Sequence, residues 1–278
     1  MPVTPQDAQR PVQVINAVAP IRICDLGGWT DTWFADHGAI LNISVYPYAE
    51  VQIYVRKVRS LDERCITIHA ENFGDRYTIN PQSGDYERHP LLEAAIEMME
   101  LPETLSFEVN LFSSAPASCS TGTSAAISVA LLGALDMLAP HPRTPHEIAI
   151  LAHRVETEKL GLQCGIQDQL CSAYGGVSFI EMFQYPYASV SQLTLPNSIW
   201  WELERRLVLI YLGKPHSSSQ VHEQVIARLE SDPTYRRILD PLRHAARNGK
   251  EALILGDLNQ FGQCMIDNTN AQAELHPS

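Results

Sequence analysis

The feature that most constrains this chain is an uncharged stretch in its middle, since no Asp, Glu, Lys or Arg occurs between Glu108 and Asp136. Apolar and polar residues alternate over residues 105–111, the period of a half-buried strand, and apolar residues at helical spacing follow over 127–138. The intervening segment, SSAPASCSTGTSAA, consists of small residues, and its proline and hydroxyls argue against a membrane span. The stretch therefore predicts a strand, a small-residue loop and a helix, in that order.

This loop has the properties of an anion-binding segment. A helix N-terminus presents unpaired N–H groups and a partial positive charge, and small side chains let a phosphate approach the main chain. Ser and Thr hydroxyls can bind phosphate oxygens or Mg²⁺. The segment has a single glycine, Gly122, and no Gly-Lys-Ser/Thr, so it is neither a Walker A loop nor a dinucleotide fingerprint. The alternative is a serine-rich turn with an ordinary helix cap.

Composition narrows the classes of partner. With 20 Lys and Arg against 32 Asp and Glu, the 278-residue chain has a formal net charge of −12, which argues against nucleic-acid or anionic-membrane binding. An apolar content of 45% is sufficient for a folded core. The six cysteines include no C-x-x-C pair, and the N-terminus lacks the pattern of a signal peptide. We therefore expect a soluble, cytoplasmic protein without disulfides or a zinc ribbon.

The order of the periodic segments predicts an α+β fold. Strands are expected at 12–18, 39–45, 51–58, 66–68, 105–111, 177–182 and, buried on both faces, 207–212; helices are expected at 91–100, 127–138, 144–159, 167–176 and from about 220 onward. Thr144-Pro145-His146-Glu147 has the pattern of a capping box with proline at the first helical position. The proline-containing stretch 183–200 is expected to be a loop that divides the chain into domains 1–195 and 196–278.

Two carboxylates are candidates for phosphoryl-transfer chemistry. Glu156 lies at the border of the buried face of its helix, where its partner is either a metal ion or a neighbouring basic side chain. Asp168 opens a short helix that Gly175 and Gly176 end, and it is either a helix cap or a general base. His153 and Glu156 have the H-x-x-E spacing of some metal sites, but without an evident third ligand we do not expect zinc.

A third candidate segment lies near the N-terminus, where Arg22 and Asp31 bracket the pair Gly27-Gly28. Two adjacent glycines permit the close approach of a ligand to the backbone. The competing interpretation is a tight turn with one surface ion pair.

Taken together, these residues resemble the GHMP kinase superfamily, which includes galactokinase, homoserine kinase and mevalonate kinase. The segment APIRICDLGGWTD at 19–31 is similar to the substrate-binding signature of its sugar kinases. PASCSTGTSAA at 116–126 resembles its nucleotide loop, and GIQDQLCSAYGG at 165–176 is similar to the stretch that holds its catalytic aspartate. The resemblance covers nearly the whole chain and is strongest to the heptose 7-phosphate kinase and fucokinase-like branch.

The resemblance implies an ATP-dependent sugar kinase that phosphorylates an anomeric hydroxyl. Its fold would combine a ribosomal-S5-domain-2-like N-terminal domain with a ferredoxin-like C-terminal domain. Catalysis is assigned to Asp168, as base or anchor for the sugar hydroxyl, and to Arg22, while Ser124 and Glu156 would hold Mg²⁺. The sugar would contact Arg22, Gly28, Trp29, Asp31, Asp168 and Gly175, and the ATP phosphates would contact Pro116, Ala117, Ser118, Cys119, Ser120, Thr121, Gly122, Thr123, Ser124 and Ala125.

The sequence departs from the family pattern in two places. Ser120 and Thr121 stand where the nucleotide loop usually has Gly-Leu. The family's third motif, a glycine-rich segment near the C-terminus, has no counterpart before the final residues NTNAQAELHPS. We therefore expect an incomplete C-terminal domain, whose open sheet edge could be covered by a second copy in a homodimer.

Two other functions stay open at this point. One is a non-catalytic protein that binds a sugar or nucleotide on the same scaffold. The other is a GHMP kinase for a non-sugar alcohol such as mevalonate or homoserine. The segment Gly-Gly-Trp-Thr-Asp favours a polyhydroxylated substrate, because a carboxylate accepts hydrogen bonds from several hydroxyls.

Overall fold

Two long strands, β1 (Gln13–Leu26) and β2 (Gly38–Lys57), pair with each other and organise the chain. The computed structural model describes residues 10–58, 60–80, 86–115, 119–211, 218–231 and 233–275. Two compact units are present: unit 1 is formed from residues 1–21, 46–116 and 122–164, and unit 2 from residues 22–45, 117–121 and 165–278. Each unit combines separate stretches because β1 and β2 each contribute residues to both units. The domain boundary expected after residue 195 stays a prediction.

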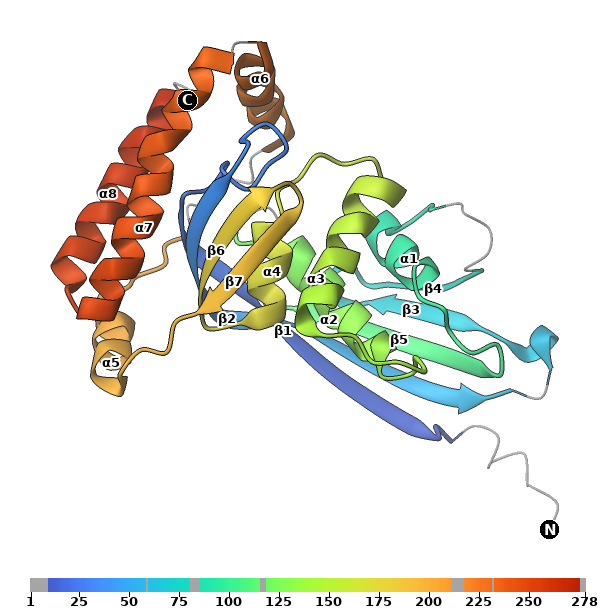
Figure 1. Ribbon diagram of the computed structural model, residues 1–278. Coiled ribbons are helices and arrows are strands. Elements are labelled where there is room, and N and C mark those ends of the chain that lie inside the picture. Colours follow the sequence, from blue (N-terminus) through green and yellow to red (C-terminus); the bar gives the residue numbers. More distant parts are fainter. Residues whose placement is uncertain are drawn as a thin grey trace. The chain divides into compact units, whose positions relative to one another are not determined.

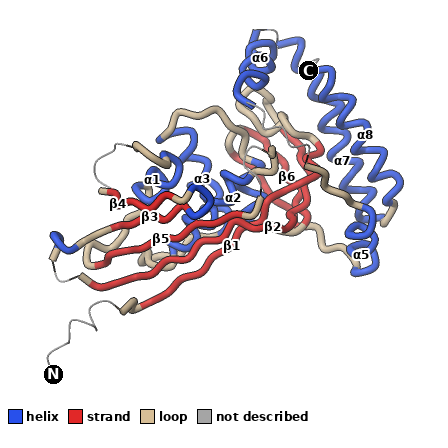
Figure 2. Tube along the Cα trace, turned by 180° about the vertical axis from the view of Figure 1, so that it is seen from behind, coloured by secondary structure: helices blue, strands red, loops and turns tan. Residues whose placement is uncertain are grey.

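Unit 1 contains part of a mixed sheet, with both antiparallel and parallel strand pairs, and helices that pack on it. The second half of β2 pairs antiparallel with β5, β5 pairs parallel with β3, and β3 pairs antiparallel with β4. Val51, Ile53 and Val55 of β2 are buried while the residues between them are half-buried, as the alternation predicts. In Figure 2, helices α1, α2 and α3 lie on the same side of β3 and β5. The elements are β3 (Ile66–Ala70), β4 (Asp75–Ile79), β5 (Leu105–Ser113), α1 (Pro90–Glu97), α2 (Thr123–Asp136), α3 (Pro145–Arg154) and a π-helical turn, η4 (Val155–Lys159), with short 3₁₀ turns at Leu61–Glu63 and Glu71–Phe73.

Unit 2 buries its core between strands and a pair of long helices. The first half of β2 pairs antiparallel with β6, which pairs with β7. Leu41 and Phe179 from these strands pack with Leu253 and Phe261 from α7 and α8, which run side by side in Figure 1. A Cβ on Gly249 would lie 2.6 Å from a methyl carbon of Leu26, so the glycine lets α7 approach this closely without a shift of the Leu26 side chain. The elements are α4 (Gln167–Tyr174), β6 (Val177–Gln184), β7 (Tyr187–Gln192), α5 (Asn197–Arg206), α6 (Ser218–Ser231), a 3₁₀ segment (Pro233–Leu239), α7 (Asp240–Leu255) and α8 (Leu258–Leu275).

These elements confirm the predicted α+β class. Antiparallel pairing dominates and no regular strand–helix–strand repeat runs through the described residues. The predicted start of α3 is also confirmed, because the Thr144 hydroxyl accepts from the Glu147 N–H and the Glu147 carboxylate accepts from the Thr144 N–H. No helix of the described part of the chain is long and apolar enough to cross a membrane.

Three predicted boundaries are wrong. The two strands expected at 39–45 and 51–58 are the single strand β2, in which residues 44–48 lie between the segments that pair with β6 and with β5. Pro47 therefore removes no hydrogen bond from either ladder. The strand expected at 12–18 continues to Leu26. The stretch 183–200 is not a loop, because Pro186 lies in the turn of the β6–β7 hairpin and Pro196 precedes the first turn of α5.

The predicted strand at 207–212 is also wrong. Residues 207–211 form no strand, and Val208 is 77% exposed and Ile210 71% exposed, whereas Leu212 lies outside the described residues. Hydrophobicity alone does not form a strand; a neighbouring strand must satisfy the backbone N–H and C=O groups. No such neighbour pairs with 207–211 within the described residues.

A buried histidine in unit 1 links stability to pH. His153 on α3 is 2% exposed, and burial lowers the pKa of its imidazole to about 4. A histidine held neutral in the folded state binds fewer protons than in the unfolded chain, so its contribution to stability is lost as pH falls from about 6.5 towards 4.

We expect His153→Gln, which stays neutral, to lose less stability than the wild type on acidification. Between about pH 7.5 and about pH 5, the free energy of unfolding of the wild type should fall by about 2 kcal/mol relative to the variant. Urea unfolding of both proteins at the two pH values measures this difference. An equal change in both proteins would contradict the burial of a neutral imidazole.

Candidate active site

The predicted catalytic pair comes together in unit 2. Arg22 lies on β1 and is 8% exposed, and its Nε donates to Oδ1 of Asp168 at 2.8 Å. Asp168 is the second residue of α4, and its side chain is 29% exposed. A short helix places this carboxylate in its first turn, where the helix dipole stabilises negative charge. The structure thus joins two residues that are 146 positions apart in the chain.

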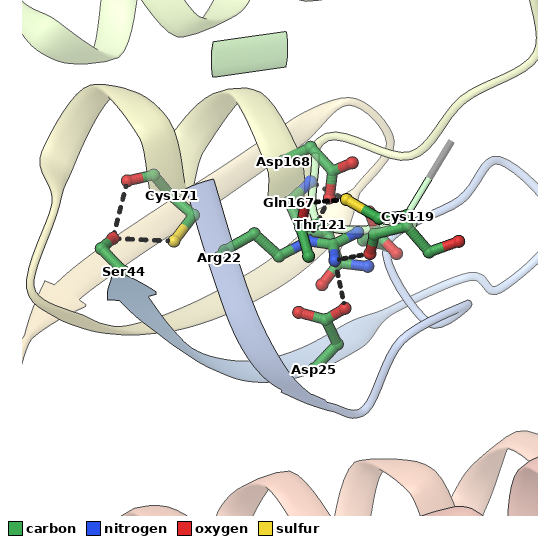
Figure 3. Close-up of polar contacts among 10 residues, drawn as sticks. Arg22, Asp25, Ser44, Cys119, Thr121, Gln167, Asp168 and Cys171 are labelled. Atoms are coloured by element: carbon green, nitrogen blue, oxygen red, sulfur yellow. Dashed lines mark hydrogen bonds and ion pairs between the residues drawn. The ribbon is translucent and has the colours of Figure 1, made fainter. Parts of the chain in front are cut away.

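Arg22 also holds the loop that precedes α2. Its Nη1 donates to the carbonyl oxygen of Ser120, and its backbone N–H donates to the carbonyl oxygen of Thr121 at 3.0 Å. Figure 3 shows the guanidinium between Asp168 and the loop residues Cys119 and Thr121. One buried cation therefore connects the candidate catalytic aspartate to the candidate nucleotide loop.

Asp25 is a member of this cluster that the sequence did not indicate. Its Oδ2 lies 2.7 Å from Nη1 of Arg22 (Figure 3). Residues three apart on a regular strand point to opposite faces, so spacing argues against this pair. Cys24, between them, has a left-handed φ of 57°, which breaks the alternation and turns Asp25 towards Arg22. No sequence signal identifies a left-handed cysteine within a strand.

Burial sets the electrostatics of the cluster. Burial raises the pKa of Asp25 to about 6, against the opposing effect of Arg22. Burial likewise raises the pKa of Asp31 to about 6, although a hydrogen bond from the Gln167 N–H opposes the rise. Burial disfavours the charge of Arg22, but the carboxylates of Asp168 and Asp25 outweigh it and raise its pKa, so the guanidinium stays charged.

The other predicted sugar-binding residues occupy different parts of unit 2. Asp31 is 1% exposed and its Oδ2 accepts from the backbone N–H of Gln167 at 2.9 Å. Trp29 is half-buried with a left-handed φ of 74°, and its ring centroid lies 6.4 Å from that of Phe34. Gly175 ends α4 at the end opposite Asp168. Gly28 and Gly175 keep their sugar-binding roles as predictions.

The predicted nucleotide loop is described from Cys119 onward; Pro116, Ala117 and Ser118 lie outside the described residues. Cys119 Sγ and Thr121 Oγ1 are 2.8 Å apart. Gly122 has a left-handed φ of 70° and is the N-cap of α2, so it brings no side chain that could cap the helix. Ser124 is exposed in the first turn. This geometry suits a phosphate at the start of α2.

The predicted metal ligands both lie in unit 1. Ser124 is in the first turn of α2, and Glu156 is 9% exposed in the π-helical turn that follows α3. Turns of this kind are rare and occur often at functional sites. No cluster of three or more His, Cys, Asp or Glu side chains in the described part of the chain is arranged to hold a metal ion. A Mg²⁺ ion would therefore depend on hydroxyl and phosphate oxygens as well as on Glu156.

Removal of Arg22 tests the cluster directly. We expect Arg22→Met to lower the free energy of unfolding by about 3 kcal/mol near neutral pH, because Asp25 and Asp168 lose their counter-ion. Burial already raises the pKa of Asp25 to about 6, and without Arg22 it rises further, so the loss should shrink near pH 5, where the Asp25 carboxyl is protonated. Chemical denaturation at the two pH values gives both numbers.

Arg56→Met is the matched control, since it removes a partner of Glu108 from a pair that is 33% and 22% exposed. It should cost less than about 1 kcal/mol and change little with pH. A cost of Arg22→Met that does not depend on pH would show that Arg22 does not neutralise the buried carboxylates.

Comparisons with known proteins agree with this geometry. Residues 90–176 match the family model of the GHMP kinases N terminal domain. The D-glycero-alpha-D-manno-heptose 7-phosphate kinase of Campylobacter jejuni is 25% identical over 259 residues, which cover 91% of this chain and 76% of that protein. The bifunctional fucokinase/GDP-fucose pyrophosphorylase of Arabidopsis thaliana is 24% identical over 275 residues, 93% of this chain but only 26% of that longer protein.

Solved structures support the same fold. A D-glycero-D-manno-heptose 1-phosphate kinase from Bacteroides thetaiotaomicron superimposes with a TM-score of 0.73 at 24% identity, over 93% of this chain and 79% of that one. The predicted fold class and the predicted class of enzyme are thereby confirmed. Residues 90–176 thus carry a GHMP kinases N terminal domain, and the chain is similar to small-molecule kinases of that type over most of its length.

Proposed function

We propose that this protein transfers the γ-phosphoryl group of ATP to a sugar hydroxyl, at the anomeric position of a heptose 7-phosphate- or L-fucose-type substrate. The observation that carries the proposal is the position of Arg22, which binds Asp168 on one side and the carbonyl of Ser120 on the other. The named relatives that act on heptose phosphate and fucose support a sugar as the acceptor.

Asp168 has the geometry of a base or anchor for the attacking hydroxyl. Arg22 binds Oδ1, so Oδ2 is the oxygen that accepts the hydroxyl proton as the sugar oxygen attacks the γ-phosphorus. The partial exposure of the side chain lets a substrate reach it. Phosphoryl transfer mainly requires in-line positioning and neutralisation of the phosphoryl oxygens, and the charged Arg22 supplies part of that neutralisation.

The start of α2 fits the phosphates of ATP. The left-handed Gly122 brings no side chain, and the exposed Ser124 lies in the first turn of the helix. Ser124 and Glu156 offer the oxygen ligands that Mg²⁺ prefers. When bound there, Mg²⁺ would neutralise charge on the β- and γ-phosphates.

A cytoplasmic location is part of the proposal. None of the six cysteines, all of which lie within the described residues, forms a disulfide, which is typical of a reducing compartment, where ATP is also available. Self-association through an open strand edge stays a prediction.

Incubation with ATP, Mg²⁺ and single acceptors tests the activity. The acceptors are heptose 7-phosphate, L-fucose, galactose and arabinose, with mevalonate and homoserine as non-sugar alcohols. Phosphorus NMR of the product should show a sugar 1-phosphate. Phosphorylation of only a non-sugar alcohol, or binding of sugar and nucleotide without any product, would contradict the proposal and favour the corresponding alternative.

The variant Asp168→Asn should lower kcat by at least about a hundredfold while the affinity for ATP stays within about threefold, because the amide cannot accept the hydroxyl proton. Asp267→Asn, at an exposed position on α8, is the matched control and should behave as the wild type. Steady-state kinetics and nucleotide titration measure the two effects. Full activity of Asp168→Asn would remove this residue from catalysis.

The variant Glu156→Gln should raise the Mg²⁺ concentration that gives half-maximal activity by about tenfold or more, because a neutral amide is a weaker ligand than a carboxylate. Glu158→Gln changes the same residue type two positions further along the same π-helical turn, where the side chain is 55% exposed. It should leave the Mg²⁺ dependence unchanged. Identical Mg²⁺ curves for both variants would exclude Glu156 as a ligand.

A further inference from the structure

We propose that Asp25 is a positioning residue: it holds the guanidinium of Arg22 away from a two-bond contact with Asp168, so that one oxygen of the Asp168 carboxylate stays available to the substrate hydroxyl. The kinetic part of this inference rests on the proposed function, whereas its structural part does not.

The contact between Arg22 and Asp168 is a single hydrogen bond. Nε of Arg22 donates to Oδ1 of Asp168 at 2.8 Å, and Arg22 makes no bond to Oδ2. A guanidinium and a carboxylate commonly form two parallel N–H···O bonds, because the fork of donors matches the two oxygens. In that arrangement Arg22 would engage both oxygens of Asp168, and Oδ2 would be less able to accept the hydroxyl proton.

Asp25 binds another side of the same guanidinium. Its Oδ2 lies 2.7 Å from Nη1 of Arg22, and the carbonyl oxygen of Ser120 accepts from the same nitrogen. In Figure 3 the carboxylates of Asp168 and Asp25 lie on either side of the guanidinium. Because a guanidinium is planar, partners on Nε and on Nη1 together fix its plane. A turn that brings Nη2 onto Asp168 would therefore move Nη1 away from Asp25.

The fold gains little from the carboxylate of Asp25. Its Oδ1 is buried and has no hydrogen-bond partner in the described part of the chain. A buried acceptor without a partner costs stability, and burial also raises the pKa of this carboxyl to about 6. The close contact of its side chain is with Arg22, so the position of Asp25 is better explained by what it does to that side chain than by stability.

Helix α8 holds the backbone of Asp25 in place. Asn268 on this helix is 6% exposed, and its Oδ1 accepts from the Gly27 N–H at 2.9 Å. Its Nδ2 donates to the carbonyl oxygen of Asp25 at 3.4 Å, and the N–H of Gly28 donates to the same oxygen at 3.3 Å. One side chain thus ties the turn after β1 to a helix 243 positions further along the chain.

The kinetic test compares Asp25→Leu with Asp25→Asn. Leucine removes the acceptor, so the guanidinium can close onto Asp168, and kcat should fall by about tenfold or more while both KM values stay within about threefold. Asparagine keeps an amide oxygen that accepts from Nη1, so its kcat should stay within about threefold of the wild type. Equal losses of kcat in the two variants would overturn the proposal, because Arg22 would then need the charge of Asp25 and not its position.

Asp240→Leu is the matched control. Oδ1 of Asp240 lies 2.7 Å from Nη1 of Arg243, so the distance and the separation of three residues are those of Asp25 and Arg22. Among the described residues Arg243 binds Asp240 and the carbonyls of Ala35 and His37, and it does not bind Asp168. Asp240→Leu should keep kcat within about threefold of the wild type. A loss equal to that of Asp25→Leu would contradict a specific role of Asp25.

A double-mutant cycle tests the support from α8. Asn268→Ala should lower kcat by about threefold or more, because Asp25 is then held less firmly, whereas Asn270→Ala, at an exposed position on the same helix, should not. In the Asp25→Leu background, Asn268→Ala should change kcat by less than about twofold. Equal effects of Asn268→Ala in both backgrounds would contradict a role through Asp25.

Crystal structures of the Asp25 variants without substrate separate this inference from the proposed activity. In Asp25→Leu, Nη2 of Arg22 should lie within about 3 Å of Oδ2 of Asp168, and in Asp25→Asn the single bond should persist. These structures need no turnover, so they decide the structural part even if no sugar is phosphorylated. A single bond that persists in Asp25→Leu would refute the proposal. If Asp25→Leu does not fold, Asp25→Ala, which adds no bulk, takes its place in each measurement.

Discussion

The candidate active site depends on one buried cation. Arg22 binds Asp168, Asp25 and the carbonyl of Ser120, and without it two partly buried carboxylates would face each other uncompensated. Arginine suits this task because its planar guanidinium has five donors in a fixed arrangement and stays charged when buried. The same contacts that neutralise the carboxylates also bring the small-residue loop to Asp168, so a single side chain couples the electrostatics of the site to its geometry.

Around this cation, unit 2 supplies rigidity from several elements. Strand β1 carries Arg22, the buried turn after it carries Asp31, and α4 carries Asp168. Burial keeps the pKa values of Asp25 and Asp31 raised, so these groups are held in place at an energetic cost that the rest of the unit offsets. Such a cost is typical of functional sites, where charged groups are fixed in advance of the substrate.

Much of this arrangement follows from local sequence patterns. The alternation in β2 and β5, the capping box of α3 and the small-residue loop before α2 each rest on interactions within a few residues, and the sequence predicts them correctly. The strand predicted at 207–212 is absent over its described residues, 207–211, because an apolar run forms a strand only beside a partner strand, which no local pattern predicts. Asp25 was missed because the left-handed Cys24 reverses the facing that strand spacing predicts. The bond from Gln167 to Asp31 joins residues 136 positions apart, so capping by a distant carboxylate is visible only in the structure.

The most direct measurement is a crystal structure of the protein with a non-hydrolysable ATP analogue and the sugar that it phosphorylates. The reacting hydroxyl should lie about 3 Å from Oδ2 of Asp168 while Arg22 keeps its bond to Oδ1, and the phosphates should contact the first turn of α2. A sugar bound away from Asp168, or phosphates bound away from residues 119–124, would contradict the account.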